Sequence, residues 1–273
     1  MTINEIIEKV KNYHPIITDY DKNPVACDGV KCGNIDQICT GIAVAIGADI
    51  DVIRRAGELN CNLLFIHEPT FYTHMDSTEW LAEDDVYRMK TELIQKYNIV
   101  IYRDHDHLHA HQPDGIFYGV MKELGWEDYL EGDSYLPMIF QLPKMTVRQL
   151  ALYIKEKMGL EKLRMAGNAD GEISRVMFYP HIFDDIDERQ KDVTKYVIEH
   201  DIDVIIPLEC IDWSVLSYMR DAGALGMNKA LLQPGHLNVE ELGMKWAVHW
   251  IRELVGADLP VTFIKSGDTY HYL

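Results

Sequence analysis

The sequence predicts an α/β protein composed of two related α/β domains with mainly parallel sheets. Short apolar, β-branched runs alternate with amphipathic helical stretches along the chain, as in sheets with crossover helices. Both halves repeat the same order of elements, and 273 residues suffice for two ordinary domains. We place the first domain at residues 1–126 and the second at 127–273, and leave open that the C-terminal strand packs back on the first.

The first half alternates helices with buried strands. Thr2 and Glu5 form a capping box, which predicts a first helix over about 3–12. Residues 14–37 read as a loop because prolines and glycines interrupt them. The predicted strands cover residues 40–46, 62–66 and 98–102, and the predicted helices cover 49–59, 86–97 and a segment capped by Asp114 that ends near 124.

A break at about 125–143 separates this half from a second series. Thr146 and Gln149 form another capping box, for a helix to about 158. We expect Asp185 to begin a helix to about 200, and Asn238 to cap a long helix to about 255. The remaining predicted elements are strands at 164–167, 173–179, 204–206, 229–233 and 261–264, and a helix at 213–222.

Composition limits the classes of partner. The chain is 47% hydrophobic and has a net charge of −18. The negative charge argues against nucleic acid and anionic membranes as binding partners and favours the binding of cations. No apolar run approaches the ~20 residues of a membrane-spanning helix. The start of the chain reads as a charged amphipathic helix rather than a signal peptide, so we expect a cytoplasmic protein. Five cysteines without a paired spacing predict reduced thiols.

The most informative stretch is Asp-His-Asp-His-Leu-His-Ala-His at residues 104–111. It holds four of the twelve histidines and two aspartates, directly after a predicted buried strand. Imidazole and carboxylate groups are the usual ligands of zinc, manganese, iron and nickel. A solvated polar loop is the alternative, but the partners found elsewhere in the sequence favour metal binding.

A weak similarity between the two halves of the sequence supplies those partners. Residues 62–68 align with 203–209, and 100–105 align with 231–236, so that a predicted strand ends at polar residues in each case. The halves then contribute His-x-x-x-His, at His105 and His109, and His-x-x-x-Glu, at His236 and Glu240. Ligands in parallel α/β sheets collect beyond the carboxyl ends of strands. Two such domains facing each other would gather these residues in one cleft, with donors for two metal ions.

Each candidate also has an ordinary structural explanation. A histidine such as His67 at a strand end could bond a backbone carbonyl, Glu68 could be a solvated loop charge, and Glu240 could simply favour a helix N-terminus. We interpret His67, Glu68, His109, His236 and Glu240 as metal ligands, with His105 as a further candidate. His107 and Glu209 are candidates for supporting these ligands or for proton transfer. His74 is a candidate for lining the site, and His14, His181, His200, His249 and His271 are expected to be structural.

These motifs resemble the NIF-three-like family of dinuclear metal proteins, also named GTP cyclohydrolase I type-two homologues. His67-Glu68-Pro69 stands where that family has His-His-Pro, and residues 102–109 stand where it has Tyr-x-x-His-Thr-x-x-Asp. The most specific piece is Gly235-His236 followed by Glu240 and Gly243, which resembles Gly-His-x-x-x-Glu-x-x-Gly. Pro207-Leu208-Glu209 replaces Thr-Gly-Glu, and Tyr179-Pro180-His181 replaces a glycine-rich turn.

The resemblance implies two α/β domains with a metal pair in the cleft between them, and assembly as a ring-shaped homo-hexamer. It carries the ligand roles onto His67, Glu68, His109, His236 and Glu240. Glu68 replaces a family histidine and His109 a family aspartate, so the total of nitrogen and oxygen donors is kept. The resemblance leaves the metal open among zinc, iron, manganese and nickel.

The sequence therefore predicts two divalent transition-metal ions and a metal-dependent hydrolase acting on a small molecule. The family name suggests opening of a purine-type ring in a nucleotide-like substrate. A non-catalytic metal-binding or regulatory scaffold is the alternative. No phosphate-cradling Gly-x-x-x-x-Gly-Lys loop and no Gly-x-Ser-x-Gly elbow occurs in the sequence, so P-loop and serine-hydrolase chemistry do not compete.

Overall fold

The structure is a computed structural model that describes residues 1–15, 27–133, 135–183 and 186–273. The chain divides into two compact units, each built around its own mixed sheet. Unit 1 contains Met1–Gly119 and Glu240–Ser266, and unit 2 contains Val120–Val239 and Gly267–Leu273. Both sheets are flanked by helices, which gives the α/β class that the sequence predicts.

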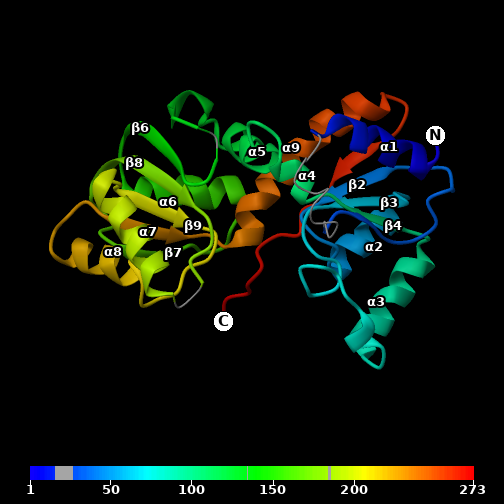
Figure 1. Cartoon of the computed structure of the whole chain (residues 1–273), viewed down its shortest axis with the longest axis horizontal. Coiled ribbons are helices and arrows are strands. Elements are labelled where there is room, and N and C mark those ends of the chain that lie inside the picture. Colours follow the sequence, from blue (N-terminus) through cyan, green and yellow to red (C-terminus); the bar gives the residue numbers. More distant parts are fainter. Residues whose placement is uncertain (16–26, 134, 184–185) are drawn as a thin grey trace. The chain divides into compact units, whose positions relative to one another are not determined.

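The sheet of unit 1 has the strand order β1-β4-β3-β2-β11. The strands are β1 (Gly29–Cys32), β2 (Ile42–Ala45), β3 (Leu63–Ile66), β4 (Val100–Arg103) and β11 (Val261–Phe263). Neighbouring strands from β4 to β11 run parallel, and only β1 pairs antiparallel, at the edge. Figure 1 shows β2, β3 and β4 side by side. The carboxyl ends of β3 and β4 therefore meet at one edge.

Three helices of unit 1 begin at polar residues whose side chains cap them. The side chain of Thr2 accepts a hydrogen bond from the amide of Glu5, and Asp49 and Asp84 cap the helices that follow them. Apolar residues of α2 and α3, such as Ile53 and Ile94, pack against the sheet around Leu64. The helices are α1 (Ile3–Tyr13), α2 (Ile50–Glu58), η2 (Glu79–Leu81), α3 (Asp85–Lys96) and α4 (Asp106–His109), with parts of α5 (Gly115–Leu124) and α9 (His236–Val255).

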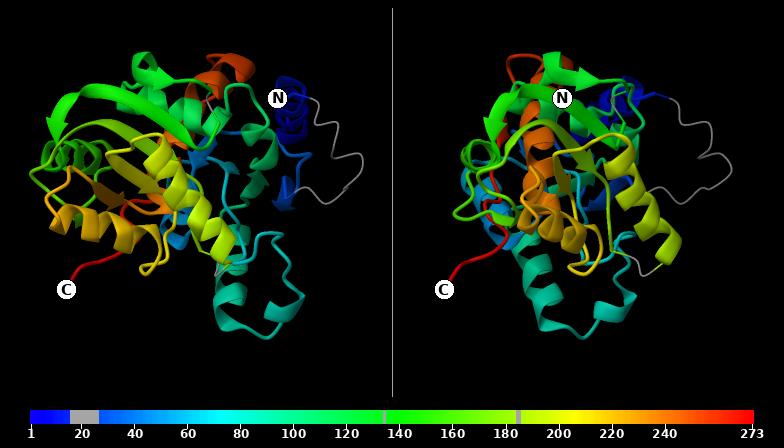
Figure 2. Two further views of the ribbon diagram at one scale, coloured as in Figure 1. Left: turned by 60° about the vertical axis from the view of Figure 1, so that its left-hand side comes forward. Right: turned by 90° about the vertical axis from the view of Figure 1, so that its left-hand side faces the viewer.

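Unit 2 has the strand order β5-β6-β8-β9-β10-β7, with a parallel centre and antiparallel outer pairs. The strands are β5 (Leu130–Glu131), β6 (Met138–Thr146), β7 (Arg164–Gly167), β8 (Glu172–Tyr179), β9 (Val204–Pro207) and β10 (Ala230–Gln233). The helical elements are η3 (Glu127–Tyr129), α6 (Val147–Met158), α7 (Asp187–Glu199) and α8 (Val215–Ala224). Both views in Figure 2 show β6, in green, as a long curved strand, and β8 pairs along it.

Most predicted elements are confirmed within a few residues, and the differences have local causes. The predicted loop at 14–37 contains β1, and the predicted break at 125–143 contains η3, β5 and the start of β6. The long helix begins at His236 rather than after Asn238, because Gly235 already accepts a hydrogen bond from the amide of Val239. The expected helix start at Asp185 lies outside the described residues.

No helix in the described ranges combines the length and the apolar composition that crossing a membrane requires. The cysteines at 27, 32, 39, 61 and 210 are free thiols, as their number and spacing predict.

Candidate metal centre

The candidate metal centre of unit 1 forms where β3 and β4 end. His67 and Glu68 directly follow β3, and both of their amides donate to the carbonyl of Ile46 beyond β2. Asp104 and His105 directly follow β4. Because these strands are parallel neighbours, the four side chains emerge at the same edge of the sheet.

His67 is held so that one ring nitrogen remains for a ligand. Its Nδ1 lies 3.0 Å from the backbone carbonyl oxygen of Asp104, which can only accept, so Nδ1 carries the proton. Its Nε2 lies 3.4 Å from Oε2 of Glu240, at the start of the part of α9 that belongs to unit 1. Within the described ranges, Nε2 of His67 is buried without a hydrogen-bond partner. Metal-bound histidines have this arrangement, with the second ring nitrogen donating to a fixed acceptor.

His105 and His109 stand beside this imidazole. The ring of His105 stacks on His67 at 4.4 Å between centroids, and the ring of His109 meets both edge-on. One ring nitrogen of each of the three histidines lies within 4.8 Å of the others. Burial lowers the pKa of His105. The short helix α4 places His109 one turn after His105, which is why the His-x-x-x-His spacing brings them together.

Asp114 orients His109 from the loop before α5. Its Oδ2 lies 2.8 Å from Nδ1 of His109, which leaves Nε2 directed away from the carboxylate. Burial alone would lower the pKa of His109, but the hydrogen bond and charge of Asp114, together with Glu240 and Glu68, raise it to about 9. This imidazole therefore sits in a strongly negative environment that also favours a metal cation.

Carboxylates complete the cluster in unit 1. One oxygen each of Glu68 and Glu240 lies within 4.8 Å of a ring nitrogen of His67. Glu240 is 2% exposed and therefore needs a cationic partner more than a surface carboxylate does. The buried guanidinium of Arg103 approaches Glu68 at 3.8 Å and donates from Nε to the carbonyl of His67. The structure thus brings together His67, Glu68, His105, His109 and Glu240.

Unit 2 holds a separate cluster around Glu209, which follows β9. Oε1 of Glu209 lies 2.7 Å from Nδ1 of His236, and Oε2 bonds Nδ1 of His181, which follows β8. Burial by itself would raise the pKa of Glu209, but the hydrogen bonds and charges of His181 and His236 lower it to about 2. This carboxylate is therefore committed to holding two imidazoles through their Nδ1 atoms.

His107 turns toward a different group. Its Nδ1 bonds Asp28, whose two carboxylate oxygens also accept from the backbone amides of residues 105–107 and so cap α4. Beyond it, Nε2 of His14 lies 2.9 Å from Oδ2 of the buried Asp104, and Nδ1 of His14 lies 2.8 Å from Nε2 of His111. His74 meets the ring of His105 edge-on, at the border of the metal cluster.

Sequence patterns do not identify three residues of these clusters. His181 was expected to be structural, although it follows the end of β8 as His67 follows β3. Asp114 was considered only as a helix cap, and its second oxygen holds His109. Asp28 bonds residues almost eighty positions away, a pairing that no local pattern indicates.

Comparisons with known proteins find one family along almost the whole chain. The sequence model of the family described as Duf34/NIF3 (NGG1p interacting factor 3) matches residues 1–269. A protein of Clostridium acetobutylicum named GTP cyclohydrolase 1 type 2 homolog is 23% identical over 249 residues, which cover 88% of this chain and 85% of that protein. A protein of Chlamydia muridarum with the same name is 30% identical over 125 residues, 46% of this chain and 44% of that protein.

Solved structures agree at the level of the fold. A hypothetical protein of Staphylococcus aureus superposes with a TM-score of 0.71 at 16% identity, covering 100% of this chain and 99% of the other. A Bacillus cereus protein related to NIF3 superposes equally well, with a TM-score of 0.71 at 15% identity and the same coverage. At such low sequence identities, these superpositions show that the fold is shared and nothing more.

Proposed function

The chain belongs to the Duf34/NIF3 family, and from this premise we propose that it is a metal-dependent hydrolase with two divalent transition-metal ions. The observation that carries the proposal is the way in which hydrogen bonds orient the rings of His67 and His109. Nδ1 of each ring is engaged by a fixed acceptor, and Nε2 of each remains for a ligand. The sets His67, His105, His109 and His67, Glu68, Glu240 supply donors in unit 1, and His236 supplies one in unit 2.

The chemistry of these donors fits such ions. Imidazole nitrogen mixed with carboxylate oxygen suits zinc, iron, manganese and nickel. A buried imidazole nitrogen without a hydrogen-bond partner, such as Nε2 of His67, costs stability unless a ligand engages it, which supports binding of a metal ion there. Ions of this class lower the pKa of water toward neutrality and polarise the bond that is broken.

The chain's own groups would bind, orient and transfer protons. Glu209 is a positioning residue, since both of its oxygens hold imidazoles. His107 is the better candidate for proton transfer, because Asp28 fixes its ring and a third of its side chain is exposed. The substrate class we propose is a nucleotide-like small molecule that undergoes ring opening, and the names of the relatives support this choice.

A non-catalytic metal-binding scaffold is the second candidate, favoured by the family's description as an interacting factor. Untagged protein, loaded in turn with zinc, manganese, iron and nickel, separates the two. Metal content and turnover of GTP and related nucleotides are measured for the wild type, for His67→Ala and for the control His200→Ala, a histidine that stacks on Tyr196 in unit 2.

The hydrolase predicts about two ions per chain and turnover, both reduced in His67→Ala and kept in His200→Ala. Two bound ions without turnover of any nucleotide would support the scaffold. Metal content near zero after metal-replete purification without chelators would reject both.

A further inference from the structure

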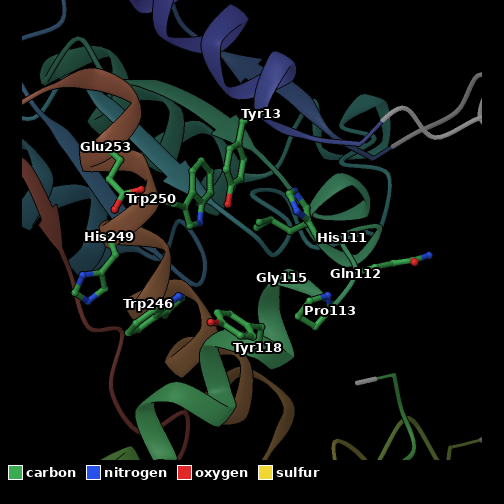
Figure 3. Close-up of a pocket in the computed structure, with 11 residues that line it drawn as sticks. Tyr13, His111, Gln112, Pro113, Gly115, Tyr118, Trp246, His249, Trp250 and Glu253 are labelled. Atoms are coloured by element: carbon green, nitrogen blue, oxygen red, sulfur yellow. The ribbon is translucent and has the colours of Figure 1, made fainter. Parts of the chain in front are cut away.

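Unit 1 contains a pocket that is lined mostly by tyrosine, tryptophan and histidine side chains, none of which is among the proposed metal donors. Its volume is about 360 Å³, within the range of small-molecule sites. Figure 3 shows Tyr13 and Trp250 standing side by side, with Tyr118 and Trp246 facing them across the opening. The pocket is formed by the end of α1, the segment between α4 and α5, the start of α5 and the second half of α9.

Helical spacing explains how α9 contributes to this pocket. Trp246 and Trp250 are one turn apart, and Glu253 follows almost one turn later, so all three lie on one face. Trp250 stacks on Tyr13 at 4.6 Å with an interplanar angle of 6°, and Trp246 meets Tyr118 edge-on at 6.2 Å. The pocket thus offers large π surfaces held in fixed orientations.

The charge around the pocket is negative. Among the lining residues in the described part of the chain, only Glu253 carries a formal charge when histidines are neutral. A second carboxylate, Asp104, lies behind the wall, fully buried and joined through His14 to the lining residue His111. Burial raises the pKa of Tyr13, and Glu253 and Asp104 raise it further, so both charges are felt at the pocket.

We propose that this pocket binds a small organic cation with alkyl or methyl groups on its charged nitrogen. Aromatic faces attract cations through the ring quadrupole, and apolar substituents on nitrogen fill the space between rings. A bare metal ion is disfavoured, because a single lining carboxylate supplies too few oxygen donors. An anion is disfavoured by Glu253 and Asp104. This site is independent of the proposed hydrolase activity.

Calorimetric titration with tetramethylammonium chloride tests the proposal on the full chain. A chelator removes metal ions, so that metal binding contributes no heat, and sodium chloride keeps the ionic strength constant. We expect saturable binding at millimolar concentrations, and at least fivefold weaker binding of tert-butyl alcohol, which has similar shape and no charge. Equal binding of the alcohol, or no binding of the cation, would overturn the proposal.

Variants locate the binding. Glu253→Gln is expected to weaken binding about fivefold, whereas Glu199→Gln, a matched exposed glutamate at the end of α7, leaves it unchanged. Tyr13 is 40% exposed, so its replacement carries little risk for folding. Tyr13→Leu should weaken binding and Tyr13→Phe should preserve it, since only leucine removes the π face. Wild-type affinity in both Glu253→Gln and Tyr13→Leu would place the cation elsewhere and reject this pocket.

Discussion

Nδ1 of His109 lies 2.8 Å from Oδ2 of Asp114, and Oδ1 of the same carboxylate accepts from the amides of Ile116 and Phe117. One carboxylate thereby fixes the start of α5 and the orientation of a candidate metal ligand. The two functions use different oxygens, so they can be separated by substitution.

Asp114→Asn should weaken metal binding while preserving the fold. Asparagine keeps an oxygen for the helix cap but loses the charge that orients and polarises His109, and such partners are worth about 10- to 100-fold in metal affinity. Competition with a chromophoric chelator measures the affinity, and thermal unfolding of chelated protein checks the fold. The matched control is Asp84→Asn, which alters the cap of α3. If Asp114→Asn and the wild type bind the metal with equal affinity, His109 is not a metal ligand.

Glu68 and His109 should be energetically coupled in metal binding. Each replaces the donor type that the resembling family has at that position, and the charge of Glu68 acts on His109. Glu68→His alone removes a carboxylate that offsets the dications, and His109→Asp alone favours harder ions. The double variant should recover affinity better than either single change. A double-mutant cycle gives the coupling, and additivity within error would contradict a shared site.

The close approach of α5 and α9 should make Gly243→Ala destabilising. A Cβ at Gly243 would lie 2.6 Å from the backbone oxygen of Ile116, which cannot move without displacing its helix. We expect a loss of about 1–3 kcal/mol in the free energy of unfolding, as for other overpacked sites. Chemical denaturation measures it. Gly47→Ala serves as control, since its nearest neighbour would lie at an ordinary 3.9 Å; equal stability of the two variants would refute the crowding.

Because of Lys90, the free energy of unfolding should increase as the pH rises above about 8. Burial lowers the pKa of Lys90 to about 8 from 10.5, although Asp49 and Asp76 act in the opposite direction. Between these values the unfolded chain binds more protons than the folded chain, so unfolding becomes harder as pH rises through this window, and the contribution is flat below pH 8. The gain across this window is on the order of 3 kcal/mol.

Lys90→Met should abolish this slope, whereas the exposed control Lys96→Met should keep it. Urea unfolding at a series of pH values between 7 and 10.5 measures the slopes. A wild-type slope in Lys90→Met would assign the pH dependence to other groups.

The assembly state is predicted from the family resemblance. A homo-hexamer should give six times the chain mass in light scattering at micromolar concentration, with and without chelator. A stable monomer under both conditions would exclude the ring.

The sequence predicted the strands whose residues are uniformly apolar. Leu63–Ile66 and Val204–Pro207 are buried along their whole length, so composition alone reveals them. The strand Met138–Thr146 was not predicted, because Gln141, Pro143 and Lys144 interrupt its apolar pattern where the strand becomes exposed. Such a strand is specified by its pairing with β8, which is a non-local contact.

Some residues of the candidate site could also be predicted from the sequence, and others could not. His67, Glu68 and His105 follow from the rule that ligands gather beyond parallel strand ends. Asp28, which holds the ring of His107, comes from a distant segment and has no periodic signal. Trp246 and Trp250 match the pattern of a buried helix face, and only the structure reveals that they line a pocket.

The position of β11 has a consequence for synthesis of the chain. β11 pairs in parallel with β2 at the edge of the unit 1 sheet, although more than two hundred residues separate them. During translation, all of Val120–Val239 leaves the ribosome before Val261–Phe263 does. The sheet of unit 1 therefore keeps β2 as an open edge strand until Val261–Phe263 has been synthesised. Nascent protein of that length exposes an apolar edge where aggregation or chaperone binding can compete with folding.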